Sequence, residues 1–137
     1  MTRKLLAVYG LKYNPFTPDI PDEALCLSPA LQHFCWRIEQ QVREGGFALI
    51  TGESGTGKSI SLRLLAQHLR TLPEIVVGTL SRPQSRLPDF YRELGDVFGC
   101  ALKVHFRWSS FKDLRARWEA HLAATLWRPV LLIDEAQ

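Results

Sequence analysis

The sequence lacks several features that would place it in other classes of protein. No apolar stretch approaches the roughly 20 residues of a membrane-spanning helix, so we expect no membrane segment in this chain. The three cysteines show no C-x-x-C spacing, which disfavours a disulfide framework or a zinc site and favours reduced, buried thiols. The first ten residues have no small-residue cleavage site and make a poor signal peptide. We therefore expect a cytoplasmic protein.

Metal-ligand spacing is also absent, because none of the four histidines has a partner at such a distance along the chain. The net charge of +3 is modest but unevenly spread. Between Arg82 and Arg128, nine Lys or Arg residues stand against five Asp or Glu. This excess is compatible with a surface that faces nucleic acid. A solvated helix face is the commoner explanation.

One complete motif is present, since residues 52–59 read G-E-S-G-T-G-K-S and match the phosphate-binding pattern G-x-x-x-x-G-K-[ST]. An apolar run over 47–51 precedes it and a helical pattern follows, which is the strand–loop–helix setting that the motif needs. The glycines let several N–H groups point at one anion, and the helix N-terminus adds partial positive charge. Lys58 would reach the β- and γ-phosphates, and the Ser59 hydroxyl would ligate Mg²⁺. The predicted nucleotide-binding residues of the loop are Gly52, Glu53, Ser54, Gly55, Thr56, Gly57, Lys58 and Ser59.

A second motif closes the sequence, where the apolar run Val130–Ile133 is followed by Asp134 and Glu135. This pattern is typical of a fully buried parallel strand with acids at its carboxyl end, the edge at which ligands sit in doubly wound sheets. Asp134 would hold Mg²⁺ through water. Glu135 is the predicted catalytic residue, which orients and polarises the attacking water. Alone the pattern is weak, but downstream of a phosphate loop it is specific.

The remaining pattern predicts an α/β fold. Prolines at 15, 18 and 21 disfavour regular structure, so residues 1–28 are predicted as an extended arm that packs Leu11, Phe16 and Leu25 onto the rest. Alternating strands and helices indicate βαβ units and a parallel sheet. The predicted elements are a helix from a Ser28 cap and Pro29 to the Gly45–Gly46 pair, a strand at 47–51, a helix from about Lys58 to Arg70, a strand at 75–80, helices at 88–98 and 109–127, the last capped by Ser109 or Ser110, and a strand ending at Asp134.

With both motifs in place, the chain resembles the AAA+-type P-loop ATPases. More narrowly, it is similar to the ExeA-like group and to the ATP-binding helpers of bacterial transposons (the TniB, TnsC and IstB kind). The residues that carry the resemblance are Tyr9–Phe16, Leu27–Pro29, Gly45–Glu53 and Leu132–Gln137. It implies ATP and Mg²⁺ as ligands, a P-loop NTPase sheet with flanking helices, and an ATPase domain whose N-terminal part is residues 29–137. It also implies that Asn14, Pro15 and Phe16 wall the adenine pocket; the alternative is that they only pack.

The chain departs from this family pattern after the acidic strand. The resemblance implies a sensor residue on a further strand, arginine fingers and a helical lid, and none of them lies within these 137 residues. In the family's strand order, the further strand lies between the phosphate-loop strand and the acidic strand. Its absence would leave backbone groups unpaired or let the two neighbours close up. We therefore expect a fragment or truncated gene product; the alternative is a minimal ATP-binding module completed by a partner.

Three functions fit these observations. The first is an ATPase that serves DNA transposition, in which ATP binding drives self-assembly of the full-length protein on duplex DNA and recruits a transposase. Arg82 and Arg86, in a polar loop after the second strand, would face the DNA. The second is a secretion-pathway ATPase of the ExeA kind. The third is a nucleotide-binding module without catalysis. The chain alone should hydrolyse ATP slowly or not at all, because the family's arginine finger is missing.

Overall fold

The computed structural model describes residues 3–17, 20–80, 87–97, 99 and 107–135. In chain order the elements are α1 (Arg3–Val8), the 3-10 helix η1 (Asp22–Ala24), α2 (Pro29–Glu44), α3 (Lys58–Arg70), β1 (Ile75–Leu80), α4 (Leu87–Val97), α5 (Arg107–Ala124) and β2 (Arg128–Ile133). Among the described helices, none has both the length and the apolar character that a membrane crossing requires.

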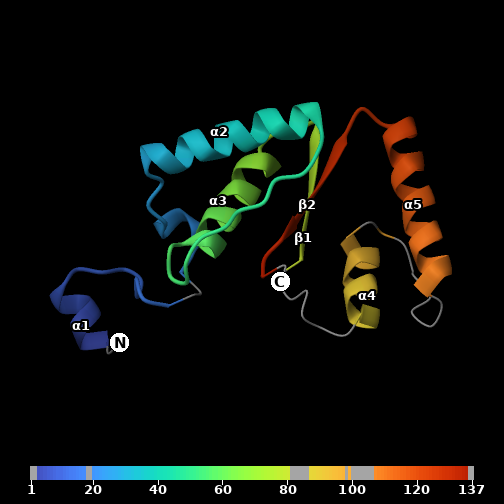
Figure 1. The fold of residues 1–137 in the computed structure, drawn as a ribbon. Coiled ribbons are helices and arrows are strands. Elements are labelled where there is room, and N and C mark those ends of the chain that lie inside the picture. The colour runs from blue at the N-terminus through green and yellow to red at the C-terminus, as the bar shows by residue number, and fades with distance from the viewer. Residues whose placement is uncertain (1–2, 18–19, 81–86, 98, 100–106, 136–137) are drawn as a thin grey trace.

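The two strands of the described sheet, β1 and β2, pair in parallel, with Val77 opposite Val130 and Leu80 opposite Ile133. Parallel neighbours need a crossover connection, and α4 and α5 lie within it along the chain. Helices α2 and α3 lie on one side of the strands and α4 on the other, with α5 beyond α4 (Figure 1). This layered arrangement confirms the predicted α/β class.

The hydrophobic core lies between the sheet and helices α2 and α3. In α3, Leu65 and Leu69 are four residues apart, so both point to the same side of the helix, and both are fully buried. They pack with Cys35 of α2, Ile75 of β1 and Leu132 of β2. Since α3 begins at Lys58, directly after the phosphate loop, this core also fixes the helix on which the loop is mounted.

On the opposite face of the sheet, helix α4 approaches the backbone of β1 very closely at Gly78. A Cβ atom placed on Gly78 would lie 2.2 Å from Cγ1 of Val97. Leu80 and Leu94 are buried on either side of this contact. The sheet therefore has helices against both faces. Helix α4 can pack against β1 because residue 78 is a glycine and has no side chain.

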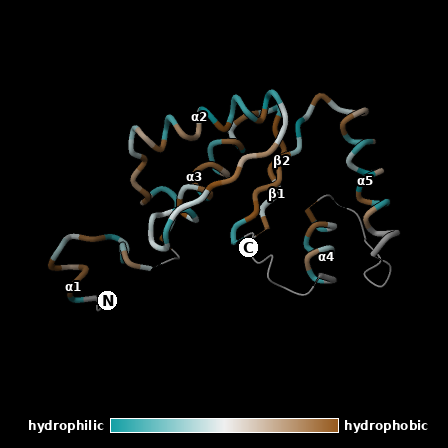
Figure 2. Tube along the Cα trace, in the orientation of Figure 1, coloured by the Kyte–Doolittle hydropathy of each residue, from teal (hydrophilic) through white to brown (hydrophobic). Residues whose placement is uncertain are grey.

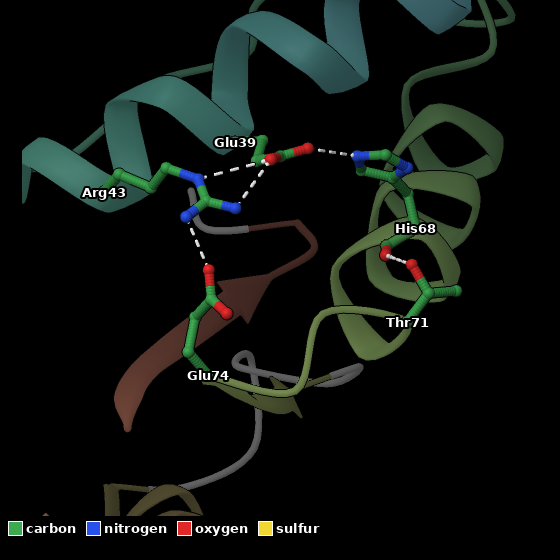
Figure 3. Close-up of polar contacts among 5 residues, drawn as sticks. All are labelled: Glu39, Arg43, His68, Thr71 and Glu74. Carbon is green, nitrogen blue, oxygen red and sulfur yellow. Dashed lines mark hydrogen bonds and ion pairs between the residues drawn. The ribbon is translucent and has the colours of Figure 1, made fainter. Parts of the chain in front are cut away.

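A polar network joins the C-terminal half of α2 to α3 and to the start of the sheet (Figure 3). Arg43 donates to Glu39 Oε1 at 3.0 Å and to Glu74 Oε1. The other Glu39 oxygen lies 2.8 Å from Nε2 of His68. The Arg128 guanidinium donates to the Arg43 carbonyl, and the Arg128 amide donates to the Glu74 carbonyl at 2.7 Å. Both strands are thus tied to α2 at their amino ends.

The segment predicted as a strand at 47–51 is not a strand. Figure 2 shows hydrophobic residues along the stretch that leads into the phosphate loop, yet Phe47 is 91% exposed and Leu49 is 77% exposed. In the described chain, β2 pairs with β1 and no strand lies beside 47–51. An extended segment gains no ladder hydrogen bonds without a neighbour, so water takes their place. The segment therefore neither lies buried and unpaired nor closes up with the acidic strand, the two outcomes that the missing strand led us to expect, because Phe47 and Leu49 are exposed and β2 pairs with β1.

The structure of the N-terminal arm also differs from the prediction. It begins with helix α1, before the first proline, where nothing in the sequence forbids a helix. Phe16 is 85% exposed and Leu11 is also exposed, so neither is packed onto the domain as predicted. Leu25 is half-buried. The prediction failed because apolar character alone does not create a surface for these side chains to cover.

Most other boundaries agree with the sequence. The Ser28 side chain caps α2 by accepting from the Leu31 amide at 3.3 Å, and α3 and β1 have the predicted bounds. Helix α5 starts at Arg107, so Ser109 and Ser110 lie inside the helix and do not cap it. Cys35 is buried as expected, whereas Cys26 is exposed and Cys100 lies outside the described residues.

We expect Gly78→Ala to destabilise the fold by about 1–3 kcal/mol, the usual cost of overpacking, because the new methyl group collides with Val97. Adding Val97→Ala should restore part of the loss by removing the colliding atom. Urea unfolding followed by circular dichroism measures both effects. Thr79→Ala, at an exposed position of the same strand, is the control. Equal stability of Gly78→Ala and the parent would contradict the close contact.

Acid should weaken the network of Figure 3 through Glu39, whose side chain is only 14% exposed. Hydrogen bonds from His68 and then Arg43 hold the pKa of Glu39 below its ordinary value of 4.5. A lowered folded-state pKa contributes stability above the unfolded-state pKa, and this is lost as the pH falls through the folded-state pKa.

Glu39→Gln should therefore cost about 1 kcal/mol at pH 7 and flatten the acid loss of unfolding free energy below pH 4.5. The measurement is urea unfolding between pH 3 and 7, with the exposed Glu44→Gln of the same helix as the control. Parallel acid losses in parent and Glu39→Gln would show that Glu39 is not responsible.

Candidate functional site

The phosphate-loop sequence forms a tight turn that ends at the N-terminus of α3. Gly55 and Gly57 have φ values of +80° and +85°, in the left-handed region that glycine enters without steric cost. Thr56 steadies the turn, because its hydroxyl donates to the Glu53 carbonyl at 2.8 Å. At Gly52 an added Cβ would lie 3.0 Å from Oγ1 of Thr56, so the loop is closed against its own start. The backbone geometry therefore favours glycine at each of the three glycine positions of the motif.

Helix α3 directs its first backbone N–H groups toward this loop. Gly57 is the N-cap, and the first hydrogen bond within the helix runs from the Ser61 amide to the Gly57 carbonyl at 2.8 Å. The amides of the preceding helical residues have no acceptor inside the helix, as at every helix N-terminus. Together with the helix dipole they favour an anion at this position.

Lys58 lies across the loop and not out in solvent. Its Nζ donates to the Gly52 carbonyl at 2.9 Å and to the Glu53 carbonyl at 2.7 Å. The ammonium group is thus held at the mouth of the loop by two backbone oxygens. A phosphate chain entering the loop would offer charged oxygens in their place, and charge-assisted hydrogen bonds are the stronger kind.

The other loop residues have exposed side chains. Ser59, the predicted magnesium ligand, stands in the first turn of α3, and Glu53 and Ser54 lie in the loop that precedes it. The loop therefore offers backbone N–H groups, the Lys58 ammonium group and the exposed hydroxyl groups of Ser54 and Ser59 to a ligand. This donor set fits a polyphosphate with a bound divalent cation.

The acidic pair follows β2 at its carboxyl end. The Asp134 amide donates to the Leu80 carbonyl at 3.1 Å and so extends the pairing with β1 by one residue. The Asp134 Oδ1 accepts from the Glu135 amide at 3.0 Å, and Glu135 has a φ of +53°, which is unusual for a residue with a side chain. The chain turns away from the strand line at this point, and Glu135 is exposed.

Lys58 donates to carbonyls of its own loop, and Asp134 Oδ1 accepts from the Glu135 amide, so the hydrogen bonds of these two side chains stay within their own segments. Figure 1 shows the start of α3 and the end of β2 toward the same, lower end of the molecule. The stretch 46–52 that leads into the loop is not paired with the described strands, so α3 is the described element that carries the loop. The sequence identified both groups but assumed that a shared sheet would join them.

The described residues hold no group of three His, Cys, Asp or Glu side chains that would form a metal site by themselves. Ser59 and Asp134 offer oxygen atoms, which are the ligands that Mg²⁺ prefers, and a nucleotide would supply further oxygens. The residues present therefore fit Mg²⁺ as a partner of a bound nucleotide rather than as a separately held ion.

The arm residues Asn14 and Phe16 form a local turn. The Asn14 Oδ1 accepts from the Phe16 amide at 3.1 Å, and the Thr17 hydroxyl donates to the Asn14 carbonyl at 3.0 Å. Sequence reasoning missed one contact that bears on the arm: Arg63 of α3 donates to the Ile20 carbonyl at 2.7 Å and to the Asp22 carboxylate. No sequence pattern indicates a pair of residues 41 positions apart.

Arg82 and Arg86, the predicted DNA-facing residues, lie outside the described residues.

Comparison with known proteins agrees with the loop and its setting. A family model described as an AAA domain matches residues 40–137. The chain is similar to a protein named General secretion pathway protein A from Aeromonas hydrophila, with 34% identity over 134 residues that cover 94% of this chain and 23% of that protein. The chain thus spans about a quarter of the length of this relative. No solved structure matches the chain. From the phosphate loop, the parallel α/β fold and the match over 40–137, we conclude that the chain belongs to the AAA domain family.

Proposed function

We propose that this chain binds ATP at residues 52–59 and that it is the nucleotide-binding part of an ATPase. The observation that carries the proposal is the loop itself, in which two left-handed glycines lead into α3 and Lys58 is held across the mouth by two carbonyls. Backbone N–H groups at the start of α3 would bind the phosphates, and Lys58 would exchange its carbonyl partners for phosphate oxygens.

Bound Mg²⁺ would neutralise part of the phosphate charge in this site. Ser59 would contribute its hydroxyl, and Asp134 would hold the ion through water. Glu135 is exposed and next to Asp134, and it would accept a proton from the attacking water.

We propose residues 1–28 as an arm and residues 29–137 as part of the ATPase domain. The similarity to General secretion pathway protein A favours a secretion-associated role. A transposition role, with duplex DNA and a transposase as partners, is supported only by the basic excess between Arg82 and Arg128 and by the resemblance of the sequence. A nucleotide-binding module without catalysis is the third candidate. The presence or absence of ATP turnover in the parent protein, measured as described below, separates the first two from the third.

Nucleotide binding should depend on Lys58. Lys58→Ala should weaken ATP binding by about 1.5–3 kcal/mol, the scale of a charge-assisted hydrogen bond, as measured by titration calorimetry on this chain with Mg²⁺ present. Lys4→Ala, at an exposed position of α1, is the matched control and should leave the affinity unchanged. Circular dichroism checks that the loop substitution leaves the helices intact. Equal affinity of Lys58→Ala and the parent would end the phosphate-loop proposal.

Glu135 should serve chemistry and not binding. Glu135→Gln should keep the ATP affinity within about twofold and reduce hydrolysis by on the order of 100-fold, since an amide does not take the proton from water. Affinity is measured on this chain, and turnover on a longer protein that contains it, because the isolated chain should be slow. An unchanged rate would assign the proton transfer to another group. No turnover in the parent protein would favour the binding-only module.

A further inference from the structure

The segment 45–53 leads from the end of α2 into the phosphate loop without a turn or a bend. Both of its ends are held by hydrogen bonds. The Gly45 amide donates to the Gln41 carbonyl of α2 at 2.9 Å. The Gly52 carbonyl accepts from Lys58 of α3 at 2.9 Å. A straight backbone that is fixed at both ends loses less conformational freedom than a flexible loop when it pairs with another strand.

The backbone groups between these two ends have not found partners. Among the described residues, the amides and carbonyls of 47–51 take part in no backbone hydrogen bond, and no strand lies beside them. Backbone groups of a folded chain pair with another segment or with water. An exposed row of them is a template to which a further strand adds.

The side chains of this segment are apolar, and several of them face water. Phe47 and Leu49 are two residues apart, so they share one face of an extended backbone, and both are strongly exposed. Ile50, which points to the other face, is half-buried. Figure 2 shows the hydrophobic character along this stretch. A single copy of the chain therefore leaves an apolar face and an unpaired backbone edge in the same place.

The sequence of this segment is complementary to itself in an antiparallel pair. Leu49 is the midpoint of 45–53, so two copies that run antiparallel about this residue bring the whole segment into register. The cross-strand pairs are then Leu49 with its own equivalent, Ala48 with Ile50, and Phe47 with Thr51. An aromatic ring opposite a β-branched side chain is a favourable cross-strand pair, and this pairing contains it twice.

Charge also favours a second copy as the partner. Residues 45–52 carry no charge, and in the antiparallel pair Glu53 falls opposite Gly45. Like charges directly opposite each other destabilise paired strands, and this pairing has none. Each copy presents the same surface to the other, as a closed twofold interface requires.

We propose that two copies of this chain associate by antiparallel pairing of residues 47–51. The pairing would use the unpaired backbone edge and cover Phe47 and Leu49 of each copy. It would also give each phosphate loop a support besides α3, since the paired segment leads directly into the loop. The interface needs no nucleotide, so its test is independent of the proposed ATP site.

Association is measured by sedimentation velocity on the 137-residue chain over a range of concentrations. The parent should shift from monomer to dimer as the concentration rises. Leu49→Lys should weaken the dimer about tenfold or more, because it places two ammonium groups opposite each other. Val8→Lys is the matched control, since Val8 of α1 is 76% exposed and Leu49 is 77% exposed. This control should leave the dimer unchanged.

A charge exchange at position 49 tests the register. Leu49→Glu alone should weaken the dimer as Leu49→Lys does. A mixture of these two variants should dimerise again, because opposite charges then face each other across the pair. A mixture of Val8→Lys and Val8→Glu should behave like the parent. Circular dichroism of each variant checks that the fold is retained.

Amide hydrogen exchange on the parent tests the pairing without any substitution. Exchange within 47–51 should slow as the concentration rises, because pairing protects the amides that donate to the other copy. Exchange in α1 should not depend on concentration. Exchange within 47–51 that is the same at every concentration would contradict the pairing.

A parent chain that stays monomeric at every concentration would overturn the inference and leave the segment for another partner, such as a strand of a different protein. A dimer that Leu49→Lys leaves intact would also overturn it, because another surface would then hold the copies together. Failure of the mixed variants to dimerise would exclude pairing about Leu49. Growth beyond a dimer would exclude a twofold interface, which closes on itself.

Discussion

The packing of α3 against β1 is the contact on which the rest of the structure depends. Leu65 and Leu69 of α3 are fully buried and meet Ile75 at the start of β1. The same helix presents its N-terminus to the phosphate loop. Burial of the leucines stabilises the helix by removing apolar area from water, and so it also fixes the direction of the N–H groups at the binding end. Core and candidate site are therefore parts of one element.

Two further contacts hold other parts of the fold against this pair of elements. Glycine at position 78 lets α4 lie directly on the strand backbone, which gives the sheet a second covered face. At the amino ends of the strands, Arg43 bridges Glu39 and Glu74 (Figure 3). The Arg128 guanidinium donates to the Arg43 carbonyl. The amino end of the sheet is thus held by charged hydrogen bonds, whereas the carboxyl end of β2 is followed by Asp134.

The apolar segment before the loop shows what happens when a local preference finds no partner. Residues 47–51 have strand character, and Phe47 and Leu49 nevertheless stand in solvent. A strand is stabilised by its neighbours, and β2 already pairs with β1 in the described sheet. The consequence for the candidate site is that, among the described elements, α3 carries the phosphate loop.

Elements with local signals could be predicted from the sequence. The Ser28–Pro29 start and the Gly45 end of α2, the bounds of α3 and β1, and the loop turn at Gly55 and Gly57 all follow from side chains and dihedral preferences within a few residues. The roles proposed for Lys58 and the acidic pair also rest on residue type and spacing, and they remain predictions.

Features that depend on contacts between distant segments could be recognised in the folded structure but not in the sequence. These are the unpaired state of 47–51, the exposure of Phe16, and the tie between Arg63 and Asp22. Strand pairing and ion pairing across 41 residues depend on where other segments lie, and no local pattern encodes that position. The physical reason is that burial and long-range hydrogen bonds depend on the whole folded chain. Caps, turns and helical spacing depend only on residues that are close together in the sequence.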